Sequence, residues 1–443
     1  MKQHRFLDRV RALDPVARSG SVSRIMPTWI EADGPNVPIG TLCAVGEGAS
    51  EIVAEVVRID SDRIALMPFG DISTLAVGAA VVARTDSAIL PVGDGFLGRA
   101  IDALGDPIDD GEPIYPGSFV PLNADLPAPL ERTSPRQIFE TGLRAIDGLL
   151  TLGIGQRFGV FAASGVGKTS LMSQIARQAD ADCAVICLVG ERGREVEHLW
   201  THELPEDVRM RTVLVAATSD KAAALRVRAV HQALALARDW RAQGKHVLFV
   251  LDSVTRLAMA MREAGLAAGE PPTVRAYTPS VFAALPRIVE QCGALKSGGA
   301  ITALMTILSE TDEIDDPIAE LMKSLLDGHV MLSRPLAERG HFPAIDVPRS
   351  ISRNASALMS RDHRDRARTV QAHLATYEGS KTLIESGLYT AGASAELDSS
   401  IAAKPEIDRY LRQDLADRVA LPATLHGLKR ISEVRHEPIA AAA

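Results

Sequence analysis

One short stretch of the sequence contains the residue types and spacing that bind phosphate. In "GVFAASGVGKTSL", Gly165 and Gly167 let the backbone turn its N–H groups toward phosphate oxygens, and Lys168 adds an ammonium group. Thr169 follows, and its hydroxyl is suited to bind Mg²⁺ beside a triphosphate. The stretch predicts a nucleotide-binding loop. The residues expected to contact the nucleotide are Ser164, Gly165, Val166, Gly167, Lys168, Thr169 and Ser170.

The loop departs from the usual G-x-x-x-x-G-K-[ST] pattern at its first position, where Ala162 replaces glycine. The replacement costs little if this residue does not need a positive φ angle. The flanking residues fit the expected context, because "RFGVFA" predicts a strand and "SLMSQIARQA" predicts a helix. We therefore predict a phosphate-binding loop between a strand and a helix.

Two carboxylates follow other predicted strands. Asp252 ends "HVLFVLD" and Glu191 directly follows "CLVG", so both should lie with Lys168 at the carboxyl edge of a parallel sheet. Asp252 is suited to organise Mg²⁺, and Glu191 to orient or polarise an attacking water. Two alternatives stay open at this point. Asp252 could be an ordinary strand-end residue, and Glu191 could form a structural ion pair with Arg192 or Arg194.

The elements that must position these residues divide the 443-residue chain into four parts. Residues 1–18 suggest a basic amphipathic segment that binds a regulatory partner or acidic lipid, or a plain terminal helix. Residues 19–89 contain short β-rich pieces and predict a small β-barrel. Residues 90–350 alternate strands with helices, which predicts a mostly parallel α/β sheet carrying the phosphate loop. Residues 351–443 predict a helical domain.

Composition argues against several classes of protein. The net charge of −8 disfavours a protein that wraps nucleic acid. No apolar run approaches the roughly 18 residues of a membrane-spanning helix, and the N-terminus lacks the apolar core of a signal peptide, so we expect a cytoplasmic protein. The cysteines have no paired spacing and are expected to be buried thiols rather than disulfides or metal ligands. They are Cys43, Cys183, Cys187 and Cys292.

Several long motifs identify a family. The phosphate loop, "LVGERGREV", "DSVTRLAMAMREAGLAAGEPPTVRAYTPSVFAALPR" and "LAERGHFPAIDVPRSISR" resemble the flagellar and type III secretion export ATPases, relatives of the catalytic subunit of rotary ATP synthases. The resemblance runs from about residue 90 to about 413 and is looser in the N-terminal β region. It implies a P-loop RecA-like core and Mg²⁺-dependent ATP hydrolysis that energises protein export, and "SGVGKT" favours the flagellar members.

The resemblance also assigns roles to single residues. It implies that Lys168 and Thr169 bind the nucleotide, that Glu191 is the catalytic carboxylate and that Asp252 binds Mg²⁺. It implies further that Arg192 and Arg256 line the phosphate side, that Arg353 is a finger reaching a neighbouring subunit's site, and that Phe342 stacks on adenine. Taken in isolation, the last two residues could equally be a surface arginine and a core phenylalanine. A finger supplied in trans stabilises charge on the γ-phosphate.

A finger and a phosphate loop on one chain predict a head-to-tail homohexamer, in which each subunit completes the next one's site. Other partners implied are stalk and regulatory proteins, export chaperones and substrates, and a gate at the inner membrane. An injectisome ATPase and a rotary synthase catalytic subunit remain alternatives, although the acidic "DELSEED"-like run of the latter is missing. A nucleic-acid translocase is disfavoured by the acidic charge, and no nucleic-acid partner is expected.

Overall fold

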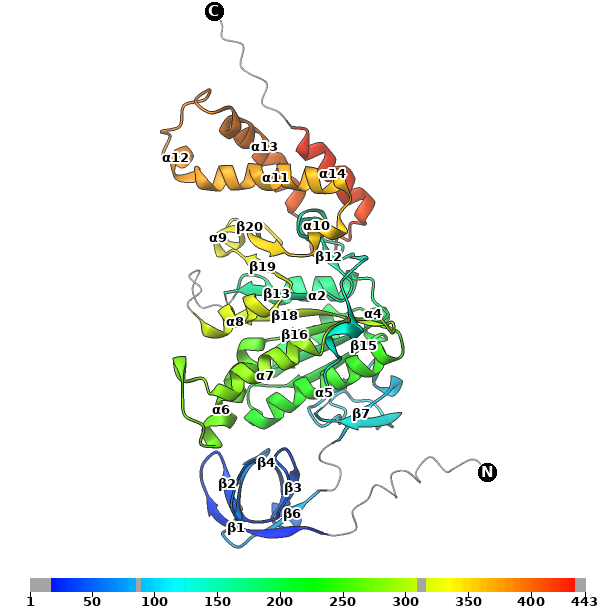
Figure 1. Ribbon diagram of the computed structural model, residues 1–443, viewed down its shortest axis with the longest axis vertical. Helices are drawn as coiled ribbons and strands as arrows, with labels where there is room; N and C mark the ends of the chain where they lie inside the picture. The colour runs from blue at the N-terminus through cyan, green and yellow to red at the C-terminus, as the bar shows by residue number, and fades with distance from the viewer. Residues whose placement is uncertain (1–16, 85–88, 124, 164, 309–315, 435–443) are drawn as a thin grey trace, which may run out of the picture.

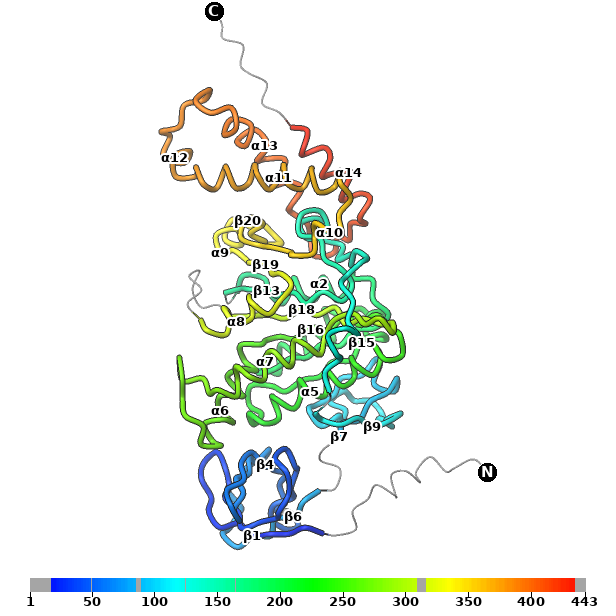
Figure 2. Tube along the Cα trace, viewed as in Figure 1, coloured from blue at the N-terminus to red at the C-terminus, as the bar shows by residue number. Residues whose placement is uncertain are grey.

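Three parts of the chain are stacked along the long axis of the molecule (Figure 1). The computed structural model describes residues 17–84, 89–123, 125–163, 165–308 and 316–434. Ser164 and nearly all of the expected segment 1–18 therefore lie outside the described residues. The tube in Figure 2 follows the chain from an N-terminal barrel through a central α/β part to C-terminal helices, which confirms the predicted fold class.

Six antiparallel strands close the N-terminal barrel in the order β1-β2-β5-β4-β3-β6. Their bounds are β1 Ser19–Ile25, β2 Ile30–Asp33, β3 Leu42–Val45, β4 Ile52–Asp60, β5 Arg63–Pro68 and β6 Ala80–Ala83. Alternate residues point inward, so Ala54 and Val56 of β4 share the barrel core with Ile30 and Leu66. Closure gives each strand a partner on both sides.

The central sheet has a main path of eight strands in the order β20-β19-β13-β18-β16-β14-β15-β8. Their bounds are β8 Ala100–Ile101, β13 Arg157–Ala162, β14 Cys183–Val189, β15 Thr212–Ala217, β16 His246–Asp252, β18 Ala300–Leu308, β19 Gly328–Leu332 and β20 Ile345–Ser352. Neighbours from β19 to β8 run parallel, whereas β20 is antiparallel to β19. The parallel α/β sheet predicted from the sequence is confirmed.

Helices cover both faces of this sheet (Figure 1). The main helices of the central part are α2 Lys168–Gln178, α3 Gly193–His198, α4 Glu206–Arg209, α5 Ala223–Ala242, α6 Val254–Ala267, α7 Pro279–Glu290, α8 Pro317–Leu325 and α9 Arg334–Glu338. Val185 of β14 lies in one core with residues of α5, α6 and α7, whereas Ile186 lies in a second core with α2. Neighbouring residues of one strand thus pack on opposite faces of the sheet.

The C-terminal part consists of helices, as the sequence predicts. They are α10 Ala355–Leu358, α11 Arg361–Gly379, α12 Lys381–Glu385, α13 Ala395–Leu411 and α14 Leu421–Ser432. Ile407 and Tyr410 of α13 and Leu428 of α14 join the same core as α2, together with Ile146 from a π-helical turn. The helical part is therefore packed directly onto the side of the central sheet that carries the phosphate loop helix.

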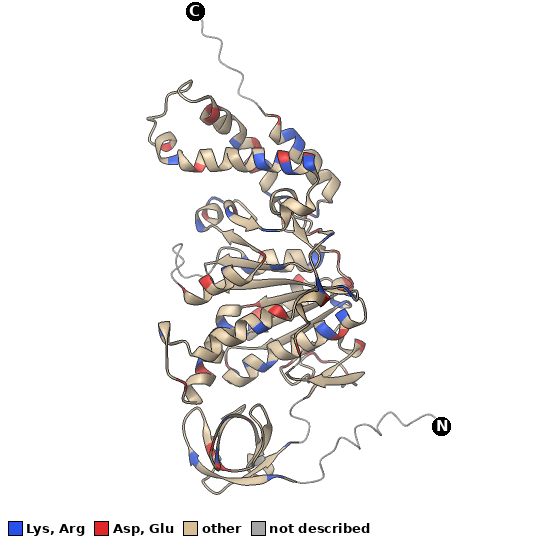
Figure 3. Ribbon diagram, in the orientation of Figure 1, with Lys and Arg blue, Asp and Glu red and all other residues tan. Residues whose placement is uncertain are grey.

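Short elements complete the described chain. The strands are β7 Ile89–Val92, β9 Ser118–Pro121, β10 Arg132–Thr133, β11 Ile138–Phe139, β12 Leu152–Gly153 and β17 Gly293–Leu295. The short helices are η1 Gly48–Ser50, η2 Asp94–Phe96, η3 Pro129–Glu131, η4 Ile146–Leu150, η5 Leu199–Glu203 and η6 Val274–Ala276. All four cysteines are buried free thiols, as predicted. Residues of both charge signs occur on all three parts (Figure 3), and none of the described helices combines the length and apolarity needed to cross a bilayer.

Candidate active site

The phosphate loop joins the end of β13 to the start of α2. Gly165 and Gly167 have φ angles of 81° and 89°, which only glycine adopts readily. Lys168 is the first residue of α2, so the loop leads into the N-terminus of an eleven-residue helix, a location that favours anions. Ala162 is the last, buried residue of β13. Its extended backbone explains why this position of the loop pattern does not require glycine.

Lys168 lies between two acidic side chains at the carboxyl edge of the sheet. Its Nζ forms a short hydrogen-bonded ion pair with Oδ1 of Asp252, and lies 3.6 Å from Oε1 of Glu191. The three residues follow or end strands of one parallel run, β13-β18-β16-β14, in which β13, β16 and β14 bring their carboxyl ends to one edge. The structure thus brings together the three residues that the sequence placed at this edge.

Glu191 is 7% exposed and is held by Arg256 as well as by Lys168. The Arg256 Nε donates to Oε1 of Glu191 at 3.0 Å. Burial raises the pKa of the Glu191 carboxyl above its usual value, although the charges of Lys168 and Arg256 oppose the rise. The ion pair of Glu191 is therefore with residues of the same cluster, and not with Arg192 or Arg194.

Asp252 has a partner that the sequence analysis missed. Thr306, buried in β18, donates its hydroxyl to Oδ1 of Asp252 at 2.7 Å. β18 lies next to β16 in the sheet, and Thr306 is one of two polar side chains in "AITALMTIL". A polar residue in an otherwise apolar strand was the signal in the sequence. Assigning it to Asp252 would have required knowing that β18 is the neighbour of β16.

Arg192 is not brought into this cluster. Its side chain is 72% exposed and its Nη1 lies 3.9 Å from Oε1 of Glu195. Arg192 precedes α3 as its N-cap, in an extended conformation that turns the chain after Glu191. The implied contact of Arg192 with phosphate stays a prediction, and within this single chain its side chain lies away from Lys168.

Phe342 lies beside the phosphate loop, and the connection between β19 and β20 brings it there. It is 45% exposed. A Cβ atom added to Gly167 would be 3.6 Å from Cε1 of the Phe342 ring. The ring is thus a partly exposed aromatic surface next to the loop, which suits stacking against a planar base.

Arg353 lies at the opposite edge of the sheet. It directly follows β20, it is exposed, and its N–H donates to the carbonyl of Asp327. Asp327 accepts a hydrogen bond from Arg157, the first residue of β13, whereas Lys168 lies beyond the end of that strand. The six residues of β13, from Arg157 to Ala162, span about 17 Å between these two places. Arg353 therefore does not reach the phosphate loop of its own chain.

The residues available for Mg²⁺ are few. Thr169 lies in the first turn of α2, and Asp252 lies beside Lys168. No group of three or more His, Cys, Asp or Glu side chains is arranged to hold a metal among the described residues. One carboxylate and one hydroxyl fit a Mg²⁺ ion that takes its other ligands from phosphates and water, as Mg²⁺ commonly does in nucleotide sites.

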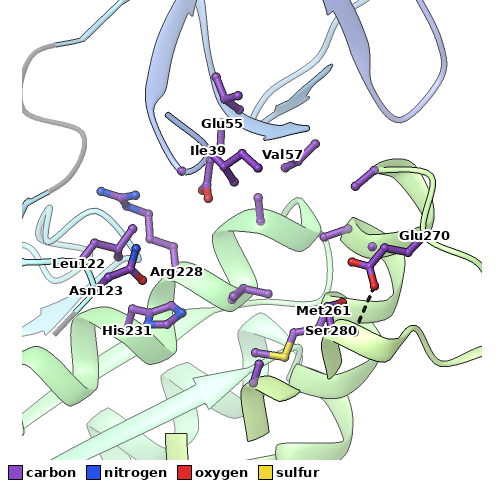
Figure 4. A pocket seen from close by; sticks show the side chains of 18 residues that line it. Ile39, Glu55, Val57, Leu122, Asn123, Arg228, His231, Met261, Glu270 and Ser280 are labelled. Carbon is purple, nitrogen blue, oxygen red and sulfur yellow. Dashed lines mark hydrogen bonds between the residues drawn. The ribbon is translucent and has the colours of Figure 1, made fainter. Parts of the chain in front are cut away.

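A separate cavity lies between the barrel and the central part (Figure 4), with a volume of about 310 Å³. Glu55 of β4 enters it from the barrel, and Arg228 and His231 of α5 enter from below. Burial raises the pKa of Glu55 to about 7, against the opposing effect of Arg228, and lowers the pKa of His231 to about 4. This cavity is distinct from the cluster around Lys168.

Comparison with known proteins agrees with this geometry. The sequence model of the ATP synthase alpha/beta family, nucleotide-binding domain, matches residues 142–352, and that of the T3SS EscN ATPase C-terminal domain matches residues 359–430. The chain is 42% identical to the flagellum-specific ATP synthase of Bacillus subtilis, over 98% of this chain and 99% of that protein. It is 41% identical to a type 3 secretion system ATPase of Pseudomonas syringae pv. tomato, over 96% of each chain.

Solved structures are similar over nearly the whole chain. The assembled ATPase EscN from the type III secretion system of enteropathogenic E. coli has a TM-score of 0.89 and 40% identity, covering 93% of this chain and 100% of that chain. The structure of the assembled EscN in complex with its central stalk EscO has a TM-score of 0.86 and 39% identity, with the same coverage.

Proposed function

The chain belongs to the ATP synthase alpha/beta family, in the group that contains the flagellum-specific and type III secretion ATPases, and from this premise we propose that it hydrolyses ATP to energise flagellar protein export. Its relatives are named ATPases and ATP synthases, which supports ATP hydrolysis as its activity. The observation that carries the proposed site is the cluster of Lys168, Asp252 and Glu191 at the end of the phosphate loop strand. The injectisome remains the alternative export system, because relatives of both kinds are about equally similar.

Each residue of the cluster has a role in this proposal. Lys168 neutralises the β- and γ-phosphates, which compete with Asp252 for its ammonium group when the nucleotide binds. Asp252 and Thr169 would hold Mg²⁺, which would neutralise charge on the phosphates. Glu191, kept in place by Arg256, orients the attacking water and accepts its proton. The raised pKa of Glu191 increases its strength as a base.

Phe342 and Arg353 act at the two ends of the nucleotide in this proposal. The half-exposed Phe342 ring stacks on adenine beside Gly167. Arg353 is too far from its own loop, at about 17 Å along β13, and is exposed at the other edge of the sheet. A head-to-tail ring would place it in a neighbour's site, where a cation stabilises the transition state.

The proposed assembly is a homohexamer in the cytoplasm, at the inner-membrane export apparatus. The similarity to EscN, whose structure was solved assembled and with its central stalk EscO, supports self-association and a stalk partner for this chain. Regulatory proteins, export chaperones, export substrates and the membrane gate are further proposed partners. Mg²⁺ is the proposed cofactor.

The shared site is tested by mixing two inactive variants. Lys168→Ala removes the phosphate lysine and Arg353→Ala removes the finger, so each variant alone should lose nearly all ATPase activity. In a one-to-one mixture, a site is complete when an Arg353→Ala subunit supplies the loop and a Lys168→Ala neighbour supplies the arginine. Random assembly makes about a quarter of the sites complete. Recovery toward a quarter of the wild-type rate is the expected result.

Arg361→Ala is the matched control, because Arg361 is also an arginine near the start of the helical part, and its side chain is 90% exposed. It should keep wild-type activity. An absence of recovery in the mixture would mean that the arginine comes from another protein, and a synthase catalytic subunit would then be the better assignment. The export system is decided in the organism that encodes the chain, since Lys168→Ala should abolish secretion of filament proteins and leave injectisome secretion intact.

A further inference from the structure

The connection between α13 and α14 runs along the nucleotide site. It begins after Leu411 and ends at Ala420, and it carries Gln413, which is 4% exposed. A glutamine amide has two donor hydrogens and an acceptor oxygen, and burial makes each of them costly to leave unpaired. The hydrogen-bond partners of Gln413 therefore show which backbone segments it holds together.

Gln413 joins three segments that are distant in the sequence. Its backbone N–H donates to the carbonyl of Phe342 at 2.9 Å. Its Oε1 accepts from the N–H of Arg144 at 3.1 Å, and its Nε2 donates to the carbonyls of Gly142 at 2.7 Å and Asp417 at 2.8 Å. Every hydrogen-bonding group of the side chain is used. The side chain anchors the backbone that in turn holds Phe342.

The same connection is fastened to the helix that follows the phosphate loop. Gln174 and Gln178 of α2 donate to the carbonyls of Asp414 and Asp417, at 3.1 and 2.7 Å. α2 begins with Lys168. The connection thus contacts both α2 and Phe342, and Gln413 is the residue of the connection that hydrogen-bonds to Phe342.

We propose that Gln413 is a positioning residue for nucleotide binding, which holds the Phe342 ring at the place where the adenine base stacks. This inference rests on the proposed function, because it deepens the role given there to Phe342. A half-exposed ring contributes to stacking only if its backbone is fixed, since a mobile ring must be ordered at each binding event. Gln413 itself does not touch the substrate in this proposal.

The test is a double-mutant cycle on ATP hydrolysis with Gln413→Leu, Phe342→Ala and the combined variant. Gln413→Leu should raise KM for ATP about three- to tenfold, the size of a stacking contribution, and leave kcat within about twofold. Phe342→Ala should raise KM by a similar factor. If Gln413 acts through Phe342, the combined variant should be no worse than Phe342→Ala alone. Multiplying effects on KM would overturn the proposal.

Gln178→Leu is the matched control. Gln178 is also a buried glutamine that donates to the carbonyl of Asp417, but it has no contact with Phe342. It should lower the melting temperature without changing KM. If Gln178→Leu raises KM as much as Gln413→Leu does, the connection stabilises the fold generally, and the proposal is wrong. Should Gln413→Leu fail to fold, Gln413→Glu keeps the acceptor for Arg144 and removes the donors to Gly142 and Asp417.

Binding without turnover separates this inference from the proposed function. Pyrophosphate has no base and cannot stack on Phe342, whereas ADP can. Gln413→Leu should weaken ADP binding about three- to tenfold and leave pyrophosphate binding unchanged. Equal weakening of both ligands would overturn the positioning role. Failure of the wild-type chain to hydrolyse ATP would count against the proposed function, and this binding comparison would still decide the role of Gln413.

Discussion

The hydroxyl of Thr306 donates to Oδ1 of Asp252 at 2.7 Å, from the strand next to the one that Asp252 ends. The same oxygen is paired with Lys168. A carboxylate that accepts a hydrogen bond from a buried, rotamer-restricted threonine keeps one orientation when the lysine changes partner. Thr306 therefore orients the carboxylate of Asp252, the proposed Mg²⁺ ligand, from the neighbouring strand.

Replacing Thr306 by valine should impair Mg²⁺-dependent activity. The substitution keeps the shape of the side chain and removes a hydrogen bond to a charged group, which is worth about 1.5–3 kcal/mol. We expect kcat/KM to fall about tenfold or more and the Mg²⁺ concentration for half-maximal activity to rise. Steady-state rates measured across a Mg²⁺ titration check this.

Thr302→Val is the control for Thr306→Val, because Thr302 is buried in the same strand and its hydroxyl accepts from the N–H of Gly155 at 2.8 Å. That contact lies at the amino end of the sheet. Thr302→Val should lower stability and leave the Mg²⁺ dependence of the rate unchanged. An equal change in both variants would show that Thr306 contributes only to packing.

Replacing Glu191 by glutamine should remove the proposed base. Glutamine keeps the size of the side chain but cannot accept a proton, so kcat should fall about a hundredfold or more while nucleotide still binds. In the wild type, burial raises the pKa of Glu191, and the base works only when ionised. The rate should therefore decline on acidification at a higher pH than an exposed glutamate would give.

The pH profile of kcat and the binding of ADP are the measurements for Glu191. Glu197→Gln is a suitable control, because Glu197 lies in the following helix α3 and its side chain is 58% exposed. This control variant should keep the wild-type rate, and its rate should decline on acidification at the same pH as that of the wild type. Substantial turnover by Glu191→Gln would show that another group accepts the proton.

The sequence predicted which candidate site residues lie together beyond the ends of parallel strands. Lys168, Glu191 and Asp252 could be placed together because parallel strands bring their carboxyl ends to one edge, whatever their order. Thr306 could not be assigned to Asp252, since that contact requires β18 to be the neighbour of β16. Strand order depends on long-range packing, which local patterns do not contain.

Contacts between residues that are far apart in the chain could not be predicted from the sequence either. Gln413 binds Arg144, 269 positions earlier, and nothing in the spacing of either residue indicates the other. The resemblance implies that Arg192 contacts phosphate, and this stays a prediction, because in the single chain its exposed side chain lies at the N-cap of α3. The fold class, by contrast, followed from the alternation of strands and helices and is confirmed.

The departure at Ala162 gives a prediction about stability. Because Ala162 ends a strand and is buried, Ala162→Gly should add backbone freedom and remove a packed methyl group. We expect a loss of about 1 kcal/mol, seen as a slightly lower melting temperature, with kcat and KM within about twofold of the wild type. A marked gain in activity would show that the usual glycine is required by the loop itself.

The cavity of Figure 4 predicts how stability depends on pH. Burial raises the pKa of Glu55 from 4.5 to about 7, so the folded protein binds the Glu55 proton more tightly than the unfolded chain. The stability from this group is fully present below the unfolded pKa and is lost as the pH rises through about 7. His231, with a pKa of about 4, stays neutral across this window, and Arg228 and Glu270 are the charged groups facing the cavity.

Glu55→Gln should therefore melt at the same temperature as the wild type below the unfolded pKa of 4.5, and higher than the wild type at pH 8. The difference corresponds to at most about 3.5 kcal/mol, since the pKa rises from 4.5 to about 7 and each pKa unit contributes about 1.4 kcal/mol. Melting curves of both proteins at several pH values give the difference directly, and other titrating groups cancel because both proteins share them. Glu51→Gln, an exposed site just before the same strand, should show a flat difference. A flat difference for Glu55→Gln as well would mean that this carboxyl stays hydrated in the folded protein.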